Sequence, residues 1–323
     1  MVKVTVNGTC REYEDGITYE TLAQEHQQEY EHRIILAVAG GKIKELHKKV
    51  DKDVTVTFQT LSDRVGHDTY VRSAVMLLIK AISDVAGSPE EGEVSVEFTI
   101  GRGLYCVPKG RLAERVVIAD GEEERQMEAE FVDRVKERMA EMVAAGLPIT
   151  KKAYPTDEAI ALFEAQGMDD KVRLFRYRRG SYINVYCLDG YYDYNYGYMV
   201  PDTSYLQYFD LLPYKEGMIL MLPDRWDPET MGSFEPREKL FHTMERSNYW
   251  GEQMGIETVA DLNDKICEGD LAEMILVQEA FQERRIAEIA GDIARRGNVK
   301  FVMIAGPSSS GKTTLDRKST RLN

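Results

Sequence analysis

The sequence predicts a protein of the α+β class, in which short strands and long helices build more than one domain. Residues 1–60 alternate strand-like and helix-like stretches, and residues 61–222 carry amphipathic helices among further strands. Near the end of the chain an apolar run meets a glycine-rich loop, which is typical of the start of an α/β domain. A length of 323 residues allows two or three domains, each large enough to bury a core.

Residues 1–60 are predicted to form a small β-grasp domain of ubiquitin-like topology. The valines of VKVTV alternate at period two, which predicts a half-buried strand, and Asn7-Gly8 supplies a hairpin turn. A helix should follow Thr18, whose hydroxyl can cap it. The runs RIILAVAGG and DVTVTF predict two further strands. The order strand, strand, helix, strand, strand favours the β-grasp.

Residues 61–222 are predicted to form one larger α+β domain with two main helices. Helix 71–85 has apolar side chains at helical spacing, and helix 123–145 carries a cleaner apolar stripe that ends at Gly146. The acidic run 122–124 should start the second helix, where carboxylates favour the helix dipole. The stripe is interpreted as core, and its members are Met127, Phe131, Val135, Met139 and Met142.

Shorter elements complete this domain. Thr156 should cap a helix over DEAIALFEAQ, with Gly167 as its stop. The stretches VSVEFTIG, VRLFRY, SYINVYCLDG and MILMLP are predicted to be strands.

The last hundred residues are predicted to connect this domain to a further one. Residues 223–298 form a connector that begins with a proline-rich stretch and ends in a long helix, roughly 270–296. The apolar run KFVMIA (300–305) predicts a central strand buried on both faces, and residues 299–323 the start of a P-loop domain.

Composition excludes several classes of function. The net charge is −14, which argues against DNA and against nonspecific nucleic-acid binding. The four cysteines are scattered without a CxxC pair, so neither a disulfide framework nor a metal framework is predicted. No apolar run approaches the length of a membrane span, and MVKVTVNG has no signal-peptide core. A cytoplasmic protein that does not contact membranes is therefore expected.

The stretch GPSSSGKTT fits the phosphate-loop pattern G-x-x-x-x-G-K-[ST] without a mismatch. Its glycines let the backbone approach a phosphate, and Lys312 is predicted to be catalytic, placing its charge on the β- and γ-phosphates of ATP. Thr313 is predicted to hold Mg²⁺ through the nucleotide. The predicted nucleotide-binding residues are Gly306, Pro307, Ser308, Ser309, Ser310, Gly311, Lys312, Thr313 and Thr314.

This loop resembles that of the phosphoribulokinase/uridine kinase family, whose members often read GxSxSGKTT. The resemblance implies transfer of the ATP γ-phosphoryl group to a nucleoside 5′-hydroxyl, with ATP and Mg²⁺ as cofactors and a uridine-like acceptor as partner. The chain is thus interpreted as the N-terminal part of a nucleoside kinase, cut just after the loop and not itself catalytic. Residues 315–323 lack the expected apolar helix face and are interpreted as a foreign tail, with a genuine but divergent helix start as the alternative.

The first 222 residues resemble another family. Residues 1–60 look like the TGS domain of threonyl-tRNA synthetases, and 61–222 look like the editing-type second additional domain that follows it there. YVRSAVMLLIKAI is similar to the helix that carries a HxxxH motif in that family, and YNYGYMVPDTSYLQYF to the stretch that supplies its Cys and His. The positions matching those four metal ligands hold Arg72, Met76, Asn195 and Met199, which implies that the metal chemistry is lost.

This second resemblance supplies the alternative function, an RNA- or nucleoside-binding regulatory module without catalysis. The tyrosine-rich run 191–208 and the basic run 176–180 are compatible with it, because tyrosine stacks on bases and arginine contacts phosphates. Strand packing and a solvated turn are the simpler interpretations of the same runs. The lone His67 is interpreted as a surface or capping residue. RNA is accordingly the less favoured partner, after ATP and the nucleoside.

Overall fold

The computed structural model describes residues 1–118 and 125–322, and it has the α+β architecture that the sequence predicts. Contacts divide the chain into two units, Met1–Tyr249 and Trp250–Asn323. Several small sheets, rather than one large one, carry the strands of the first unit. Among the described residues, no helix is long and apolar enough to cross a membrane.

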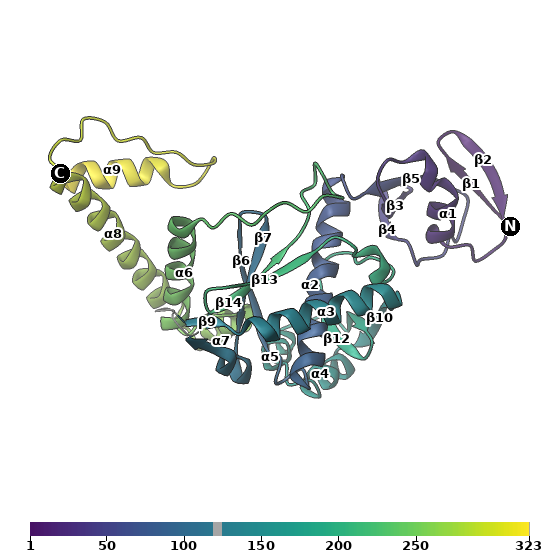
Figure 1. Cartoon of the computed structure of the whole chain (residues 1–323), viewed down its shortest axis with the longest axis horizontal. Coiled ribbons are helices and arrows are strands. Elements are labelled where there is room, and N and C mark those ends of the chain that lie inside the picture. Colours follow the sequence, from purple (N-terminus) through teal and green to yellow (C-terminus); the bar gives the residue numbers. More distant parts are fainter. Residues whose placement is uncertain (119–124, 323) are drawn as a thin grey trace. The chain divides into compact units, whose positions relative to one another are not determined.

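The N-terminal sheet has five strands around one parallel pair (Figure 1). Strands β1 and β5 run parallel at its centre, and hairpins add β2 and β4 at its edges. The predicted hairpin turn is confirmed, since Asn7 and Gly8 both have positive φ, of 48° and 81°. The strands are β1 (Val2–Val6), β2 (Thr9–Tyr13), β3 (Ile34–Ala39), β4 (Lys42–Glu45) and β5 (Val54–Thr60), in the order β2-β1-β5-β3-β4.

Helix α1 (Tyr19–His26) packs its apolar face on this sheet and is followed by the short 3-10 turn η1 (Gln27–Glu29). The predicted cap is confirmed: the Thr18 hydroxyl accepts a hydrogen bond from the amide of Thr21 at 3.2 Å. Leu22 and Ala23 are buried against the strands. The element order predicted for residues 1–60 is therefore observed, with β4 as an added edge strand.

Two long helices form the core of the following part, α2 (Arg64–Ala86) and α3 (Ala129–Ala145), which pack against each other (Figure 1). The predicted stripe of α3 is buried as expected, including Phe131, Val135 and Met139. The predicted start at residue 123 is wrong, because Arg125–Met127 pair as strand β9 with β8 (Val116–Ile118). The acidic run 122–124 lies outside the described residues.

A four-stranded antiparallel sheet and a three-stranded one complete the first unit. The first has the order β13-β14-β7-β6 and the second the order β10-β11-β12. The predicted strands VSVEFTIG, SYINVYCLDG and MILMLP are confirmed in them. The strands are β6 (Val94–Ile100), β7 (Gly103–Pro108), β10 (Ile149–Pro155), β11 (Tyr182–Leu188), β12 (Tyr191–Tyr194), β13 (Asp210–Tyr214) and β14 (Gly217–Met221), with 3-10 turns η2 (Gly110–Arg115) and η3 (Thr203–Tyr205).

The stretch VRLFRY is helical, so its prediction as a strand is wrong. It forms most of α5 (Asp169–Arg176), which packs beside α4 (Thr156–Glu164). Val172 and Phe175 are three residues apart, so a helix turns both onto Phe163, and the Phe163 and Phe175 rings stack at 5.5 Å. Thr156 does not cap α4; it is the first helical residue, and its hydroxyl donates to the Gly180 carbonyl at 2.6 Å.

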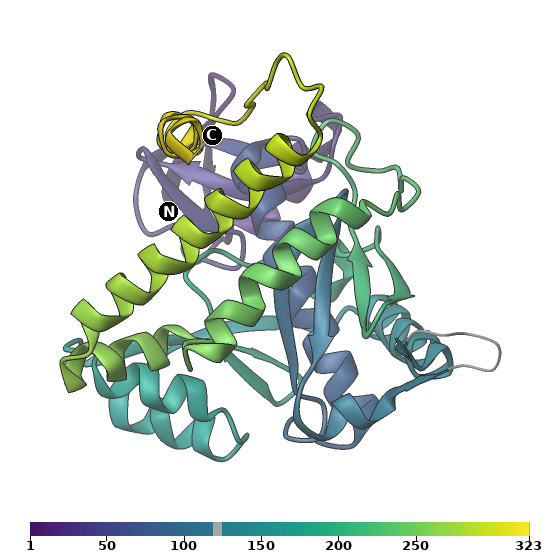
Figure 2. The same cartoon turned by 90° about the vertical axis from the view of Figure 1, so that its left-hand side faces the viewer.

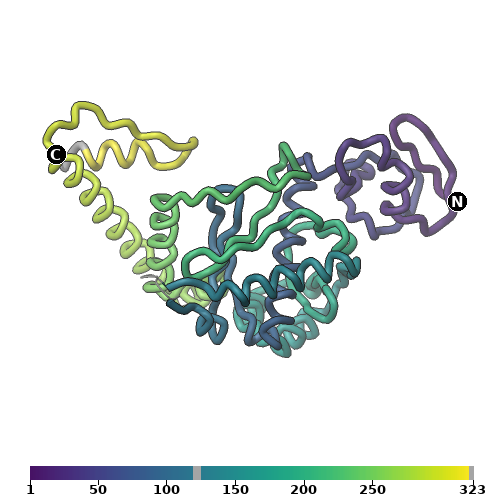
Figure 3. The backbone as a smooth tube through the Cα atoms, viewed as in Figure 1, coloured from purple at the N-terminus to yellow at the C-terminus, as the bar shows by residue number. Residues whose placement is uncertain are grey.

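An irregular proline-containing stretch, residues 223–237, leads to helix α6 (Glu238–Gln253) (Figure 3). Helix α7 (Val259–Glu268) starts with a capping box between Thr258 and Asp261. The predicted long helix is confirmed as α8 (Leu271–Arg295), which runs unbroken (Figure 2). Helix α9 (Lys312–Leu322) follows the glycine-rich loop and contacts α8.

The apolar run 300–305 is not a strand, which corrects the sequence prediction. Phe301 and Met303 are 89% and 95% exposed, and no strand pairs with this run in the described part of the chain. A central strand needs a hydrogen-bonded neighbour on each side, and residues 1–118 and 125–322 provide neither.

Candidate functional site

The segments that carry the residues matching the synthetase metal ligands meet in space. Arg72 and Met76 lie on α2, and Met199 lies in the segment after β12. The Arg72 Nε donates to the Tyr198 carbonyl at 3.2 Å, and the Ser73 hydroxyl lies 3.4 Å from the Met199 sulfur. Met76 and Met199 are both 1% exposed. The fold therefore brings this helix face against this segment, as the sequence resemblance implies.

The Arg72 side chain lies flat against the backbone of Gly197. A Cβ at Gly197 would lie only 2.0 Å from the Arg72 Nε, so the absence of a side chain there makes room for the guanidinium. Its second anchor is the Thr69 hydroxyl, at 3.1 Å from Nη2. Burial lowers the pKa of Arg72, but a guanidinium stays charged in proteins. A fixed cation therefore occupies the place where the resemblance would put a metal ligand.

Glu45, from strand β4 of the N-terminal sheet, reaches into the same region and is fully buried. The Tyr186 hydroxyl lies 2.5 Å from its Oε1, and the Lys151 ammonium lies 3.2 Å from its Oε2. The Met199 amide donates to it at 3.3 Å. Burial, reinforced by the bond to Glu45, raises the pKa of Tyr186, which therefore stays protonated. This buried network is complete, because every neighbour of the carboxylate is a donor.

Lys151 adds a cation beside two tyrosine rings. Its ammonium lies 4.8 Å from the Tyr186 ring centroid and 5.9 Å from that of Tyr198. Sequence reasoning missed Glu45, Lys151 and Tyr186 as members of one site. Their partners are 106 and 141 positions away in the sequence, so no local spacing could indicate the pairing.

This network borders a cavity of about 500 Å³. Lys151 and Thr150 of β10 form one wall, and Glu20 and His47 from the N-terminal part form another. Burial lowers the pKa of His47, which favours its neutral form. The lining residues are Glu20, His47, Gly146, Pro148, Ile149, Thr150, Lys151, Pro201 and Asp202.

No group of three or more histidine, cysteine, aspartate or glutamate side chains within residues 1–118 and 125–322 could hold a metal ion. His67 binds the Pro223 carbonyl through Nε2 at 3.0 Å, which is a structural contact. The arrangement can bind polar or aromatic groups through cations, phenols and backbone, but it offers no ligand set for a metal-activated water.

The tyrosine-rich run packs mostly as strand and turn, the simpler of the two interpretations. Tyr191 and Tyr205 are buried, and the guanidinium of Arg33 lies 3.7 Å from the Tyr205 ring centroid. Tyr196 is the tyrosine of this run that is open to solvent, at 91% exposure. In the basic run, Arg178 donates to the Tyr194 hydroxyl at 3.1 Å.

The glycine-rich loop lies in the second unit. The Lys312 ammonium donates to the carbonyls of Gly306 at 2.9 Å and Pro307 at 2.5 Å, and lies 3.4 Å from the Ser310 hydroxyl. Ser309 and Gly311 have positive φ, of 61° and 76°. The loop thus curls around the lysine, and its amides lead into helix α9.

The remaining predicted nucleotide-binding residues stand at the surface. Ser308 and Ser309 form the turn, while Thr313 and Thr314 lie in the first turn of α9. A Cβ on Gly306 would lie 2.7 Å from the Ser310 hydroxyl, so the curl is tight at this glycine. The structure brings these residues together, but the described segment before the loop, residues 296–305, contains no strand.

Curated proteins similar to this chain include threonine–tRNA ligases, and no family model matches it. The ligase of Acetivibrio thermocellus is 22% identical over 57% of this chain and 28% of its own length. That of Methylococcus capsulatus is 25% identical over 64% of this chain and 30% of its own. That of Carboxydothermus hydrogenoformans is 26% identical over the same shares, 64% and 30%. The chain therefore spans less than a third of the length of these relatives.

These comparisons overturn the nucleoside kinase prediction. The relatives are ligases that act on tRNA, not kinases, and the buried strand that a kinase loop requires is absent from the described residues. The predicted uridine-like acceptor is wrong for the same reason, and RNA, the less favoured partner in the sequence analysis, is the better supported one. The chain is similar to threonine–tRNA ligases, at low identity, over about 64% of its length.

Proposed function

We propose that this chain is an RNA- or nucleoside-binding module related to the editing region of threonyl-tRNA synthetases, and that it does not hydrolyse what it binds. One observation carries the proposal. The segments that resemble the editing site meet in space, yet Arg72, Met76 and Met199 stand where metal ligands would be.

The chemistry of the network explains why binding and hydrolysis separate. Hydrolysis at such a site needs a bound metal or a free base to activate water. Glu45, the carboxylate of this network, is already bonded to Tyr186 and Lys151 and has no access to solvent. Lys151 and Thr150 face the adjoining cavity, where they offer donors to ribose hydroxyls or phosphate.

We further propose the domain division that the two resemblances suggest. Residues 1–60 form a TGS-like β-grasp domain, and 61–222 an editing-like domain without metal ligands. Residues 223–298 connect it to a P-loop unit that begins at residue 299. The sheet order β2-β1-β5-β3-β4 with helix α1 across it supports the first assignment.

Binding of a tRNA to the whole chain tests the main proposal. Fluorescence anisotropy with a labelled tRNA should give a salt-dependent affinity, measurable at about 50 mM and weaker at about 200 mM salt. A mischarged tRNA should stay intact when the protein is in excess, with or without added zinc. Absence of binding at both salt concentrations would contradict the binding function. Release of the amino acid would contradict the claim that the site does not hydrolyse.

The glycine-rich loop supports a second, separate binding function. We propose that Gly306 to Thr314 bind the phosphates of ATP, with Mg²⁺ held through the nucleotide at Thr313. The curl around Lys312 fits a phosphate, because its ammonium now contacts only oxygens of the loop itself. A phosphate must displace those contacts, so the affinity should be weak. Bound Mg²⁺ would neutralise the β- and γ-phosphates.

A fluorescent ATP analogue measures this binding directly. The Lys312→Ala variant should lose about tenfold or more in affinity, because it removes the side-chain cation of the curl. Lys318→Ala is the matched control, since Lys318 lies on the same helix but pairs with Glu283 at 2.9 Å. Equal affinities of the wild type and the Lys312→Ala variant would contradict the assignment.

A further inference from the structure

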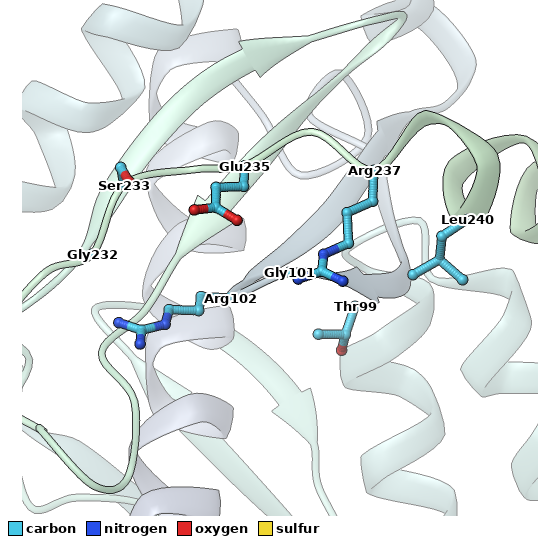
Figure 4. Close-up of a pocket in the computed structure, with 8 residues that line it drawn as sticks. All are labelled: Thr99, Gly101, Arg102, Gly232, Ser233, Glu235, Arg237 and Leu240. Carbon is cyan, nitrogen blue, oxygen red and sulfur yellow. The ribbon is translucent and has the colours of Figure 1, made fainter. Parts of the chain in front are cut away.

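A second cavity, of about 630 Å³, lies in the first unit and belongs to neither site above. It opens between the β6–β7 turn and the irregular segment that leads into α6 (Figure 4). Two arginines, one from each side, give it a cationic lining. The lining residues are Thr99, Gly101, Arg102, Gly232, Ser233, Glu235, Arg237 and Leu240.

Glycines shape this pocket. Gly101 has a φ of +59°, which sets the tight β6–β7 turn and projects Arg102 from it. A Cβ on Gly232 would lie 2.6 Å from the Arg102 Nη1, so the arginine lies across the bare backbone of the facing segment. The guanidinium is thereby held at the pocket wall without being buried.

The charges of the pocket are only partly balanced. Arg102 has one acidic neighbour, Asp224, at the long distance of 4.0 Å, and Arg237 has no ion pair within the described residues. Glu235 projects from the same segment as Arg237 (Figure 4). The lining itself holds two guanidinium groups and one carboxylate, while the Asp224 carboxylate that faces Arg102 lies outside the lining.

An exposed tryptophan stands beside this cationic pocket. Trp226 is 81% exposed, and the guanidinium of Arg225 lies 4.2 Å from its ring centroid. The Asp224 carboxylate links it to the pocket, because one oxygen accepts from the Trp226 amide at 2.9 Å and the other faces Arg102. An indole with this exposure is available to stack on a planar group.

We propose that this pocket binds a backbone phosphate of single-stranded RNA, with Trp226 stacking on an adjacent base. Planar guanidinium forks match phosphate oxygens, and an aromatic side chain next to a cationic groove is the general arrangement for single strands. This inference rests on the proposed RNA-binding function and adds to it a second binding surface, away from the editing-like site.

The salt dependence of RNA binding tests the phosphate contact. The double variant Arg102→Ala/Arg237→Ala should bind a tRNA with a single-stranded end about tenfold more weakly at about 100 mM salt. The slope of log K against log salt should fall by roughly 0.7 for each phosphate that the variant no longer neutralises. Arg134→Ala is the matched control, because it removes one exposed charge from α3, outside the pocket. It should leave the slope unchanged.

Two further variants test the assignment, and the effect of the first is one that misfolding cannot mimic. Glu235→Gln removes the opposing carboxylate and should tighten RNA binding roughly two- to fivefold, which an unfolded variant cannot do. Trp226→Ala should lower the affinity for single-stranded RNA about tenfold or more. The slope of log K against log salt should stay unchanged, since stacking releases no counterions.

The outcomes separate this inference from the function on which it rests. If the wild type binds tRNA but the double variant and Arg134→Ala bind equally well with equal slopes, the pocket assignment is overturned and the RNA function stands. If the wild type binds no RNA at any salt concentration, both the pocket assignment and the RNA-binding function are contradicted. Binding of inorganic phosphate alone, with no effect of the variants on RNA, also overturns the assignment.

Discussion

At the scale of single residues, Glu45 shows how one buried charge ties distant segments together. Its carboxylate is fully buried and meets a phenol, an ammonium and a backbone amide from parts of the chain more than 100 positions away. Because each contact is a donor, the network is satisfied and stable. Removing the carboxylate takes this acceptor from all three donors, of which the Tyr186 hydroxyl keeps a second acceptor, the Gly197 carbonyl.

We therefore expect Glu45→Ala to destabilise the protein by about 3 kcal/mol, since it leaves the largely buried Lys151 ammonium without its carboxylate. Glu45→Gln keeps the shape and should cost less. Urea denaturation followed by circular dichroism measures both. Glu12→Ala is the control, because the Glu12 side chain is 57% exposed and pairs with Lys3 only at the surface. A loss at Glu45 no larger than that at Glu12 would contradict this account.

His47 should make stability depend on pH. Burial lowers its folded-state pKa below the unfolded value of 6.5, so the unfolded chain binds more protons as the pH falls. The stability contributed by neutral His47 is present above that value and is lost as the pH falls through 6.5 toward the folded-state pKa. His47→Gln should flatten the stability curve between about pH 7.5 and 5.5.

At the scale of elements, helix α2 begins in close contact with the end of strand β5. A Cβ on Gly66 would lie 1.9 Å from the Thr60 carbonyl oxygen, a backbone atom that cannot turn aside. The Asp63 carboxylate fixes the same corner by accepting from the Thr60 amide at 2.7 Å. The junction between the N-terminal sheet and the helix that carries Arg72 therefore depends on this glycine.

Gly66→Ala should lower the urea midpoint and cost roughly 3 kcal/mol or more, because helix and strand must separate to admit the methyl group. The same substitution at Gly291 in α8 meets nothing closer than the Arg295 Nη1 at 3.4 Å. Gly291→Ala should therefore stabilise α8 slightly, because alanine has a higher helix propensity than glycine. Hydrogen exchange of the two helices reads the effects separately; equal effects of the two substitutions would contradict the packing argument.

The sequence predicted elements well where one periodicity dominates. The stripe of α3 and the Asn7-Gly8 turn are local patterns, and both are found. VRLFRY was misjudged because four apolar residues interrupted by two arginines within six positions fit either period, and only its packing on Phe163 selects the helix. The contacts of Arg72 could be anticipated only through the resemblance, whereas those of Glu45 depend on tertiary structure alone.

At the scale of the whole molecule, the two units differ in how much apolar surface they bury. In the second unit Ala260, Ile286 and Ala290 are buried, while Leu276, Phe301 and Met303 are exposed. A segment with few buried contacts and an unpaired backbone, such as residues 299–305, has a low free energy of local unfolding. KFVMIA read in isolation indicates a central strand, but a strand is defined by its neighbours, and the described residues supply none.

Brief chymotrypsin digestion should therefore cut first at Phe301, before any site within residues 1–249. Mass spectrometry of the early fragments identifies the site. Saturating Mg-ATP should slow this cut if the adjoining loop binds nucleotide. First cleavage within the N-terminal sheet would contradict the order of stabilities inferred from burial.

The bond between Glu45 and Lys151 has a consequence for any attempt to divide the chain. Glu45 of the N-terminal sheet is the counter-ion of Lys151, which belongs to residues 61–222 and whose side chain is only 16% exposed. A shortened protein that starts after residue 60 would keep the lysine and the Tyr186 phenol but lose their shared anion. Residues 61–222 of this shortened protein should then recover their native fold only when residues 1–60 are added as a separate peptide.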